Sequence, residues 1–303
     1  MPSSLPRPLS DLPIRRLTRD DLIACADLSE DRGWPRDEER WSLLLAAGTG
    51  YGIDDPAGKG LMATCVVVSY GPGMAAVGML LVAGRHARRG IGRYVMQRVI
   101  ETAGGTTLSL HATSTGRPLY EELGFVAVGR TVRLHGSFRP PAVPASFQPT
   151  AVSGPRPPAG PGAVIRSASA QDLRALVQLD SVVFGLDRTH LLTRLPMFAD
   201  HLRVAEEDGE LIGYAALSPS AENHSVGPLI ARDTATAKLL LSSLAAATDR
   251  PLRVDVDARH EELLDWLGAC GLLAVSNTTV MVLGERQHGD WPRYFAPLSL
   301  ATG

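Results

Sequence analysis

The sequence over residues 80–94, LLVAGRHARRGIGRY, restricts the fold more than any other part of the chain. An apolar run ending at residue 82 predicts a buried strand, a cationic loop follows over residues 85–89, and the residues after the loop have helix composition. The first amides of a helix have no partner within it and lie at the positive end of its dipole, so they bind anions. Gly90 and Gly92 remove side chains that would hold a phosphate away from the backbone. This order predicts a pyrophosphate site, with a solvated basic turn as the alternative.

A second segment over residues 116–129, GRPLYEELGFVAVG, predicts a short helix that ends in Leu-Gly-Phe and runs into a strand. Together the two segments resemble motifs A and B of the GCN5-related N-acetyltransferases (GNAT), whose pyrophosphate loop reads R/Q-x-x-G-x-G/A and whose second motif ends in Tyr, Leu, Gly and Phe. The resemblance covers about residues 14–136. Ala87 stands where the family usually has Arg or Gln, and Thr113 where it often has Asn.

The resemblance implies an α/β (α+β) fold with a mixed, mainly antiparallel central sheet flanked by helices. It implies acetyl-CoA as co-substrate, a loop that binds largely through backbone amides, and no metal. The residues that it assigns to acetyl-CoA are Leu80, Leu81, Val82, Ala87, Arg88, Arg89, Gly90, Ile91, Gly92, Arg93 and Thr113. Arg85, Arg88 and Arg89 are expected to supply positive charge in place of the missing loop residue.

A proline-rich segment over residues 139–162 divides the chain, and its composition predicts an extended linker. The second half opens as the first does, with a strand at 164–166, a cap at 169–172 and a helix, which predicts an internal repeat. No glycine pair follows Ala231, and Leu267 takes the place of Tyr120, so the second half resembles the cofactor-free domain of tandem acetyltransferases. We therefore predict a disordered lead-in at 1–13, a catalytic GNAT domain at 14–138, a linker at 139–162 and a degenerate GNAT-like domain at 163–303.

Acetyl transfer to an amine requires a neutral amine, a polarised carbonyl and a donor for the departing thiolate. Tyr120 is the candidate acid, because a phenol of pKa near 10 is protonated beside a thiol of pKa near 8.5. Its alternative role is packing within the second motif. His111, at the end of a predicted strand over 107–111, is the candidate base, and a structural role is its alternative. Water, Asp54 or Glu38 are other candidate bases.

Four residues are candidates for contact with the acceptor. Trp34 and Trp41 lie in the region that forms one wall of the acceptor cleft in the resembled fold, although tryptophans also serve in cores and interfaces. Asp255 and Asp257 alternate on a predicted strand and share one face, where they attract a cationic substrate or are simply solvated.

Composition limits the partners and the compartment. The chain of 303 residues has 45% apolar residues, 20% charged residues and a formal net charge of −2, which favours neither nucleic acid nor an anionic membrane. Its three cysteines, Cys25, Cys65 and Cys270, have no metal spacing, and the start of the sequence lacks the apolar core of a signal peptide. No apolar run approaches the length of a membrane span. We expect a reduced, cytoplasmic protein.

The prediction is an acetyl-CoA-dependent N-acetyltransferase in which a primary amine attacks the thioester directly. The acceptor is expected to be a small molecule, that is, an amino acid, a polyamine or a natural product such as an antibiotic. The alternatives are a protein lysine or N-terminal acetyltransferase and, in another class, a non-catalytic acyl-CoA-binding or interaction protein. The second half is expected to shape the acceptor cleft, with homodimer formation as a further option. A chain truncated near Arg139 is expected to keep acetyl-CoA binding but to lose acceptor affinity or solubility.

Overall fold

The computed structural model describes residues 9–140, 162–285 and 289–303. Residues 1–8 of the predicted lead-in, and residues 141–161 of the predicted linker, lie outside this range. The 3₁₀-helix η1 (Leu9–Asp11) contacts α3 (Ile91–Ala103), and the hydroxyl of Tyr94 donates to the carbonyl oxygen of Leu12 at 3.0 Å. A disordered lead-in is therefore wrong for residues 9–13.

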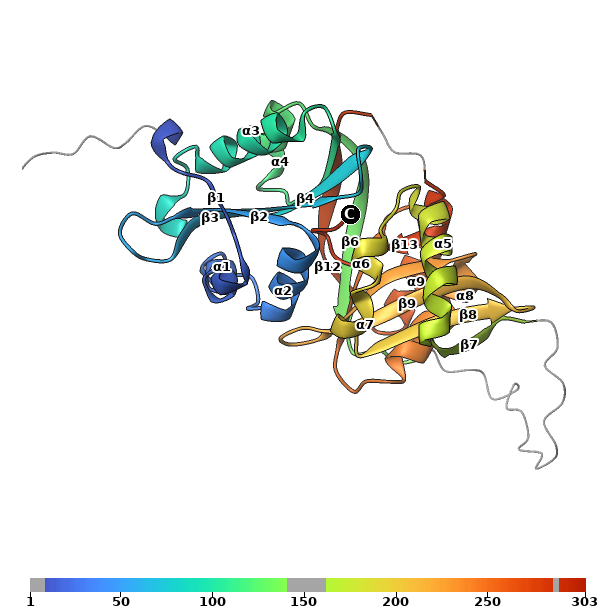
Figure 1. The fold of residues 1–303 in the computed structure, drawn as a ribbon. Helices are drawn as coiled ribbons and strands as arrows, with labels where there is room; N and C mark the ends of the chain where they lie inside the picture. The colour runs from blue at the N-terminus through green and yellow to red at the C-terminus, as the bar shows by residue number, and fades with distance from the viewer. Residues whose placement is uncertain (1–8, 141–161, 286–288) are drawn as a thin grey trace, which may run out of the picture.

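The first half follows the predicted order of strands and helices. After η1, its elements are β1 (Arg15–Arg16), η2 (Arg19–Asp21), α1 (Leu22–Asp31), α2 (Glu38–Ala47), β2 (Thr49–Asp54), β3 (Leu61–Ser69), β4 (Met74–Val82), η3 (Gly84–His86), α3, β5 (Thr107–Ala112), α4 (Arg117–Glu122) and β6 (Val126–Gly136). Helices α3 and α4 cover one face of the sheet and α1 and α2 the other, as Figure 1 shows.

The second half repeats this order with two short helices, α6 and α7, in the place of α2, and with η6 and β13 added at its end. Its elements are β7 (Val164–Ser167), η5 (Ala170–Asp172), α5 (Leu173–Phe184), α6 (Thr189–Leu192), α7 (Leu195–Phe198), β8 (His201–Glu207), β9 (Glu210–Pro219), β10 (His224–Ala231), α8 (Thr234–Ala245), β11 (Leu252–Asp257), α9 (Glu261–Ala269), β12 (Leu273–Leu283), η6 (Trp291–Arg293) and β13 (Tyr294–Ala296). None of the helices in the described ranges is long and apolar enough to cross a membrane.

The repeat extends to individual side-chain contacts. A capping box precedes the first long helix of each half, and an arginine on the preceding strand binds the carboxylate that closes it. Arg15 donates to Asp21 at 3.0 and 2.7 Å, and Arg166 donates to Asp172 at 2.8 and 2.8 Å. Two halves with the same local device at the same place are a structural duplication.

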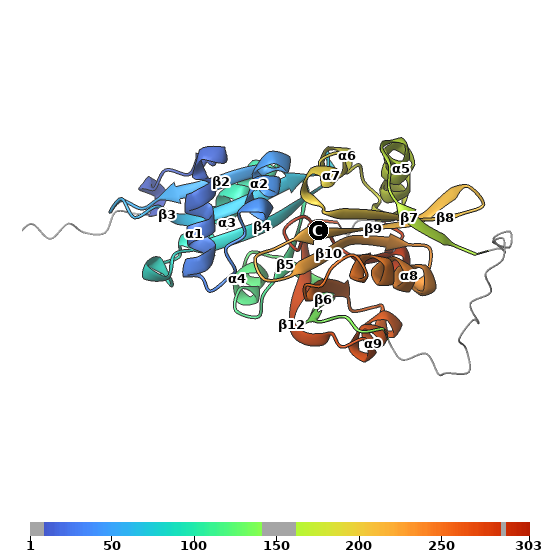
Figure 2. The same ribbon diagram turned by 90° about the horizontal axis from the view of Figure 1, so that it is seen from below.

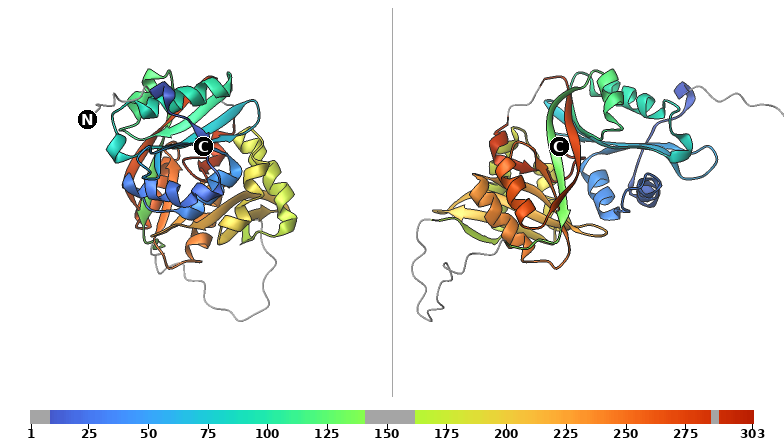
Figure 3. Two further views of the ribbon diagram at one scale, coloured as in Figure 1. Left: turned by 60° about the vertical axis from the view of Figure 1, so that its left-hand side comes forward. Right: turned by 180° about the vertical axis from the view of Figure 1, so that it is seen from behind.

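The two halves share one sheet, because their last long strands are exchanged. The strand order is β1-β2-β3-β4-β5-β12-β6-β11-β10-β9-β8-β7. In this order β12, from the second half, pairs with β5 of the first half. In exchange β6, from the first half, pairs with β11 of the second half. β12 and β6 also pair with each other, and they lie side by side at the junction of the halves (Figures 1 and 3). Neighbouring pairs are antiparallel except β4–β5 and β10–β11, as the predicted mixed, mainly antiparallel sheet requires.

The core also crosses the boundary between the halves. One buried cluster contains Trp41 and Ala76 of the first half together with Phe184 and Tyr294 of the second. Two further clusters lie beneath α3 and beneath α8 and α9, and each takes in a residue of the exchanged strand, Met281 of β12 in the first and Leu134 of β6 in the second. Seen from below, the helices of the two halves flank a continuous sheet (Figure 2).

Candidate active site

Strands β4 and β5 separate at their carboxyl ends and leave an open edge. Their parallel pairing begins with Met74 opposite Thr107 and ends with Val77 opposite Leu110. Beyond this point β4 and β5 do not pair with each other. β4 bulges at this point, with Met79 at a φ of 52°, and then continues to its end. Up to Val82 this last part of β4 still pairs with β3, so the main-chain groups on its other edge face the gap, where an extended ligand can pair with them.

The loop after β4 leads into a helix whose first amides are free of side-chain caps. Gly90 is the N-cap of α3 at a φ of 79°, and it makes no side-chain capping bond. Arg88 and Arg89 are exposed, and neither has an ion-pair partner among the described residues. Arg85 differs from them, since its Nε donates at 2.6 Å to the buried carboxylate of Asp55. The charge available to an anion at the α3 amides therefore comes from Arg88 and Arg89.

Gly92 lies in the first turn of α3, close to β4 and α4. A Cβ built on Gly92 would lie 3.6 Å from both Leu119 and Val82 and 4.0 Å from Leu80, so a larger side chain would fill the space between α3, α4 and β4. Arg93 forms an exposed ion pair with Glu122 of α4. The loop, the helix end and the open strand edge form a cradle that fits a diphosphate joined to an extended arm.

The remaining residues predicted to bind acetyl-CoA lie around this cradle. Leu81 and Ile91 are buried, so only their main-chain atoms can face a ligand, whereas Ala87 is exposed in the loop. Thr113 lies at the turn after β5, where its hydroxyl accepts from the amide of Gly116 at 3.1 Å. The structure thus brings the predicted set together at one end of the gap.

Tyr120 on α4 lies beside the cradle, packed against the residues below α3. Its ring meets Phe125 edge to face at 5.8 Å between centroids. Burial, with a further contribution from the nearby Cys65, raises the pKa of the Tyr120 hydroxyl well above 10. No hydrogen-bond partner for this hydroxyl occurs within the described ranges.

His111 lies on the opposite face of β5, where it lines a pocket. Its Nδ1 is 3.3 Å from the hydroxyl of Thr131 on β6. Burial lowers the pKa of His111 to about 4, opposed by Asp255 and Asp257 and reinforced by Arg133. At neutral pH the imidazole is uncharged.

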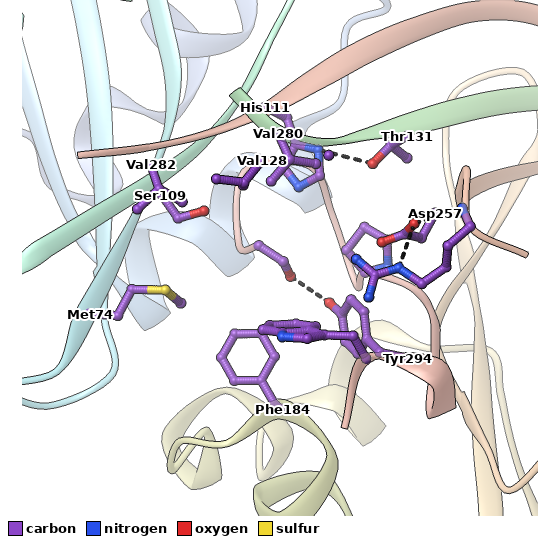
Figure 4. A pocket seen from close by; sticks show the side chains of 15 residues that line it. Met74, Ser109, His111, Val128, Thr131, Phe184, Asp257, Val280, Val282 and Tyr294 are labelled. Carbon is purple, nitrogen blue, oxygen red and sulfur yellow. Dashed lines mark hydrogen bonds and ion pairs between the residues drawn. The ribbon is translucent and has the colours of Figure 1, made fainter. Parts of the chain in front are cut away.

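The pocket lies between the two halves and has a cavity volume of about 80 Å³. Figure 4 shows its apolar walls, with Met74, Val280 and Val282 above Phe184 and Tyr294, and His111 at the upper edge. The segment after β13 closes one side, where the hydroxyl of Tyr294 donates to the carbonyl oxygen of Gly303 at 2.7 Å. A pocket with these walls depends on both halves and on the last residues of the sequence.

Asp255 and Asp257 are not solvated strand carboxylates. Asp255 is 6% exposed and accepts hydrogen bonds from Arg133 at 2.6 Å and from Arg253 at 2.6 Å. Burial raises the pKa of Asp255, but the charges and hydrogen bonds of Arg253 and Arg133 together outweigh it and lower this pKa to about 2. Asp257 lines the pocket and pairs with Arg259 at 2.9 Å. Both carboxylates are therefore neutralised by arginines, which weakens the predicted attraction for a cation.

The two tryptophans have different environments. Trp41 is 1% exposed, belongs to the core and donates from Nε1 to the hydroxyl of Ser29 at 2.9 Å. It therefore has the core role that was the alternative to contact with the acceptor. Trp34 is 41% exposed between α1 and α2. Of the other candidate bases, Asp54 binds Arg15 at 2.7 Å and Glu38 binds Arg36 at 2.9 Å.

The second half lacks both parts of the cradle. At the start of α8 the carboxylate of Asp233 accepts from the amide of Thr236 at 2.8 Å, where α3 has an uncapped glycine. β10 and β11 also separate, after Val226, but β13 pairs with the rest of β10 and contacts β11. Asp233 thus caps the helix end, and β13 covers the strand edge, at the two places that correspond to the open helix end and open β4 edge of the first half.

Sequence reasoning missed the contribution of the exchanged strands and of the C-terminal segment. Thr131 and Arg133 come from β6, and Tyr294 comes from a strand of three residues. Thr131 and Arg133 pair with strand residues more than 100 positions away, and Tyr294 pairs with Ile230 of β10, so no local pattern predicts that these residues meet around the pocket.

Comparison with known proteins gives the family. Models of the acetyltransferase (GNAT) domain match residues 66–138 and residues 176–296. An N-acetyltransferase of Bacillus subtilis (strain 168), YitH, described as uncharacterised, is 30% identical over 291 residues, which covers 95% of this chain and 97% of the relative.

Two solved structures have the same fold. A putative acetyltransferase from Pyrococcus horikoshii gives a TM-score of 0.75 at 20% identity and covers 100% of this chain and 99% of its own. A tandem GNAT protein from the clavulanic acid biosynthesis pathway gives 0.61 at 16% identity, over 91% of this chain and 100% of its own. With both halves matched by the domain models and a relative aligned over nearly its whole length, the chain belongs to the GCN5-related N-acetyltransferases, as a tandem-domain acyltransferase.

Proposed function

We propose that the first half binds one acetyl-CoA and transfers its acetyl group to a primary amine of a small molecule. The observation that carries this proposal is the contrast between the halves. The first half has an open β4 edge and a helix end without a side-chain cap, whereas β13 and Asp233 occupy the corresponding places in the second half.

The cradle would hold the co-substrate through main-chain groups. The amides at the start of α3 and the exposed Arg88 and Arg89 would bind the diphosphate, and the free edge of β4 would bind the extended arm. When bound, acetyl-CoA supplies an activated acyl thioester. Gly92 keeps the cradle open, as its neighbours lie at van der Waals distance from the position of a Cβ.

Tyr120 would act on the leaving group as a hydrogen-bond donor. Its pKa is raised above 10 by burial, whereas a thiol has a pKa near 8.5, so complete proton transfer from the phenol is unfavourable. A phenol that stays protonated at every working pH can still donate a hydrogen bond to a developing thiolate, and such bonds to charged groups are strong. The lack of a protein partner for the hydroxyl, in the described part of the chain, leaves it available for this role.

His111 would position the amine instead of deprotonating an ammonium ion. A base of pKa about 4 cannot compete for a proton with an alkylamine, whose pKa is near 10. A neutral imidazole can, however, accept a hydrogen bond from an amine that arrives uncharged. The proton would then leave through water.

The pocket favours a small acceptor over a protein. It lies between the halves, and residues after β13 close one side, so a folded protein surface could not reach His111 without displacing them. A protein lysine or N-terminal acetyltransferase remains the alternative enzyme. The buried, free cysteines suit a cytoplasmic location, which we propose together with the absence of nucleic-acid and membrane partners. Homodimer formation stays a prediction.

Mass spectrometry tests the proposal. The full chain is incubated with isotopically labelled acetyl-CoA and a panel of small amines, peptides and a lysine-rich protein. We expect label on small amines and release of one thiol per product. Label on the protein alone would favour the protein acetyltransferase, and no label despite acetyl-CoA binding would favour the non-catalytic alternative.

A further inference from the structure

Two carboxylates from other parts of the first half hold the loop that precedes α3. The amide of Gly84, the first residue of η3, donates at 2.6 Å to Asp31, the last residue of α1. The other two residues of η3 meet Asp55, in the turn after β2. The Nε of Arg85 donates to one carboxylate oxygen at 2.6 Å, and the Nε2 of His86 lies 2.9 Å from the same oxygen. The short helix η3 is thereby fixed between the end of α1 and the turn that follows β2.

Asp55 is itself held in place by its own turn. Its carboxylate accepts from the amide of Ala57 at 2.8 Å, and its amide donates to the carbonyl oxygen of Gly60 at 2.8 Å. The side chain is only 2% exposed. Burial raises the pKa of Asp55, but the hydrogen bonds from His86, the amide of Ala57 and Arg85 outweigh it and hold this pKa well below its usual range. A buried, ionised carboxylate needs such donors, and two of them come from the loop.

The loop needs this support because it contains a strained residue. Arg88 has a φ of 64°, in the left-handed region that residues other than glycine rarely adopt, and Gly90 follows at 79°. In the described part of the chain Arg88 makes no hydrogen bond of its own that would hold this conformation. Strained conformations persist where the surrounding structure fixes them, and they gather at ligand sites. Amides in such a turn form a concave surface that receives anions.

The turn that carries Asp55 lies at the same end of the sheet as the cradle. Val82, at the end of β4, pairs with Ala63 near the start of β3. The Nη2 of Arg85 donates to the carbonyl oxygen of Lys59, in the same turn, at 2.7 Å. The turn is therefore connected both to the end of β4 and to the loop, so a shift of this turn would move the residues that lead into α3.

We propose that Asp55, assisted by Asp31, is a positioning residue for acyl-CoA, which holds η3 and the left-handed turn at Arg88 in the conformation that receives the diphosphate. This inference rests on the proposed function for the place of the diphosphate, and on the hydrogen bonds of η3 for the role of the two carboxylates. A loop that is ordered before binding loses less conformational freedom when the ligand binds, so the ligand binds more tightly.

Calorimetry with acetyl-CoA on the full chain tests the role of Asp55. In Asp55→Asn an NH₂ group replaces one oxygen and faces either the amide of Ala57 or the donors of Arg85 and His86. We expect the Kd of acetyl-CoA to rise at least tenfold. Asp172→Asn is the matched control, because Asp172 is also a largely buried carboxylate that binds an arginine and a backbone amide, but in the second half. The control should lose stability and keep the Kd.

A double-mutant cycle separates positioning from a general loss of stability. Arg88→Gln removes one charge from the cradle and should raise the Kd of acetyl-CoA at least fivefold in the otherwise unmodified chain. In the Asp55→Asn background the same change should raise the Kd less than twofold, because the turn no longer presents residue 88 to the diphosphate. Additive effects of the two changes, or an unchanged Kd in Asp55→Asn, would overturn the proposal.

Asp31 keeps the test independent of the folding of Asp55→Asn. Asp31 is exposed at the end of α1, so Asp31→Ala removes the bond to Gly84 at little cost in stability. We expect the Kd of acetyl-CoA to rise at least threefold and hydrogen exchange of the amides of residues 84–87 to become faster. An unchanged Kd and unchanged exchange would contradict the support of η3 by carboxylates.

Failure of the proposed function gives a different result. If the unmodified chain does not bind acetyl-CoA, the proposed function is wrong, and the positioning role falls with it. If the unmodified chain binds acetyl-CoA and Asp55→Asn binds it as tightly as Asp172→Asn does, the function stands and the positioning role of Asp55 is wrong.

Discussion

Arg133 of the first half donates from Nε to Asp255 of the second half at 2.6 Å, across strands that exchange partners between the halves. Asp255 is 6% exposed and also binds Arg253, so its removal leaves two arginines without their carboxylate. Breaking a buried charge pair in this way costs about 3 kcal/mol. We expect Asp255→Asn to lower the free energy of unfolding by this amount in urea titrations. Glu207→Gln, at an exposed pair, is the control and should change it little.

The same pair predicts how stability depends on pH. The pKa of Asp255 is lowered to about 2, below the value near 3.9 of an unfolded aspartate. Its stabilising contribution is therefore present above pH 4 and is lost as the pH falls from 4 to 2, because the unfolded chain binds the proton first. Urea titrations across this range should show a shallower decline in Asp255→Asn than in the unmodified protein. Parallel declines would show that Asp255 is not the group responsible.

Truncation after Arg139 should abolish folding. Removal of residues 140–303 takes β12 away from β5 and β11 away from β6, because these strands are exchanged between the halves. Both β5 and β6 then lose strand-pairing hydrogen bonds and the apolar residues that cover them. This outcome replaces the expectation that the truncated chain keeps acetyl-CoA binding. Circular dichroism and gel filtration of the truncated chain should show an aggregated or unfolded species. A soluble monomer that binds acetyl-CoA would contradict the importance of the exchange. Coexpression of both halves as separate chains should restore folding.

The order of elements was predictable because it depends on local patterns. The continuous apolar runs of β3 and β4, the glycines at the start of α3 and the repeated caps at Thr18 and Ser169 are patterns of a few neighbouring residues. The exchange of β6 and β12 was not predictable, since both strands fit either partner by length and polarity. For the same reason Arg133 and Arg253, whose role depends on strand pairing, were not identified, while Gly90 and Tyr120 were named from their motifs.

Replacement of the phenol should affect turnover more than binding. In Tyr120→Phe we expect kcat to fall by ~10–100-fold with little change in the Kd of acetyl-CoA, because the hydrogen bond strengthens only as the thiolate develops. The ring keeps its contact with Phe125, so stability should be nearly unchanged. Steady-state kinetics and calorimetry measure the two effects. An unchanged kcat would assign Tyr120 to packing alone.

The neutral state of His111 should be visible in the pH dependence of stability. Its pKa is about 4 in the folded protein, below the value near 6.5 of an unfolded histidine. Stability is therefore lost as the pH falls from 6.5 toward 4, by ~1–3 kcal/mol, since the unfolded chain takes up a proton that the folded chain excludes. His111→Gln should reduce this dependence. An NMR titration in which His111 has a pKa of 6 or more would contradict this lowered pKa.

The stoichiometry of acetyl-CoA tests the division of roles between the halves most directly. Calorimetry on the full chain should give one site, which Gly92→Val in the cradle weakens at least tenfold and which Gly268→Val, at a glycine of α9 with open space around its Cβ position, leaves unchanged. Retained folding of the cradle variant is checked by its thermal unfolding. Two equal sites per chain, or one site with an affinity that does not respond to Gly92→Val, would contradict the assignment of acetyl-CoA to the first half.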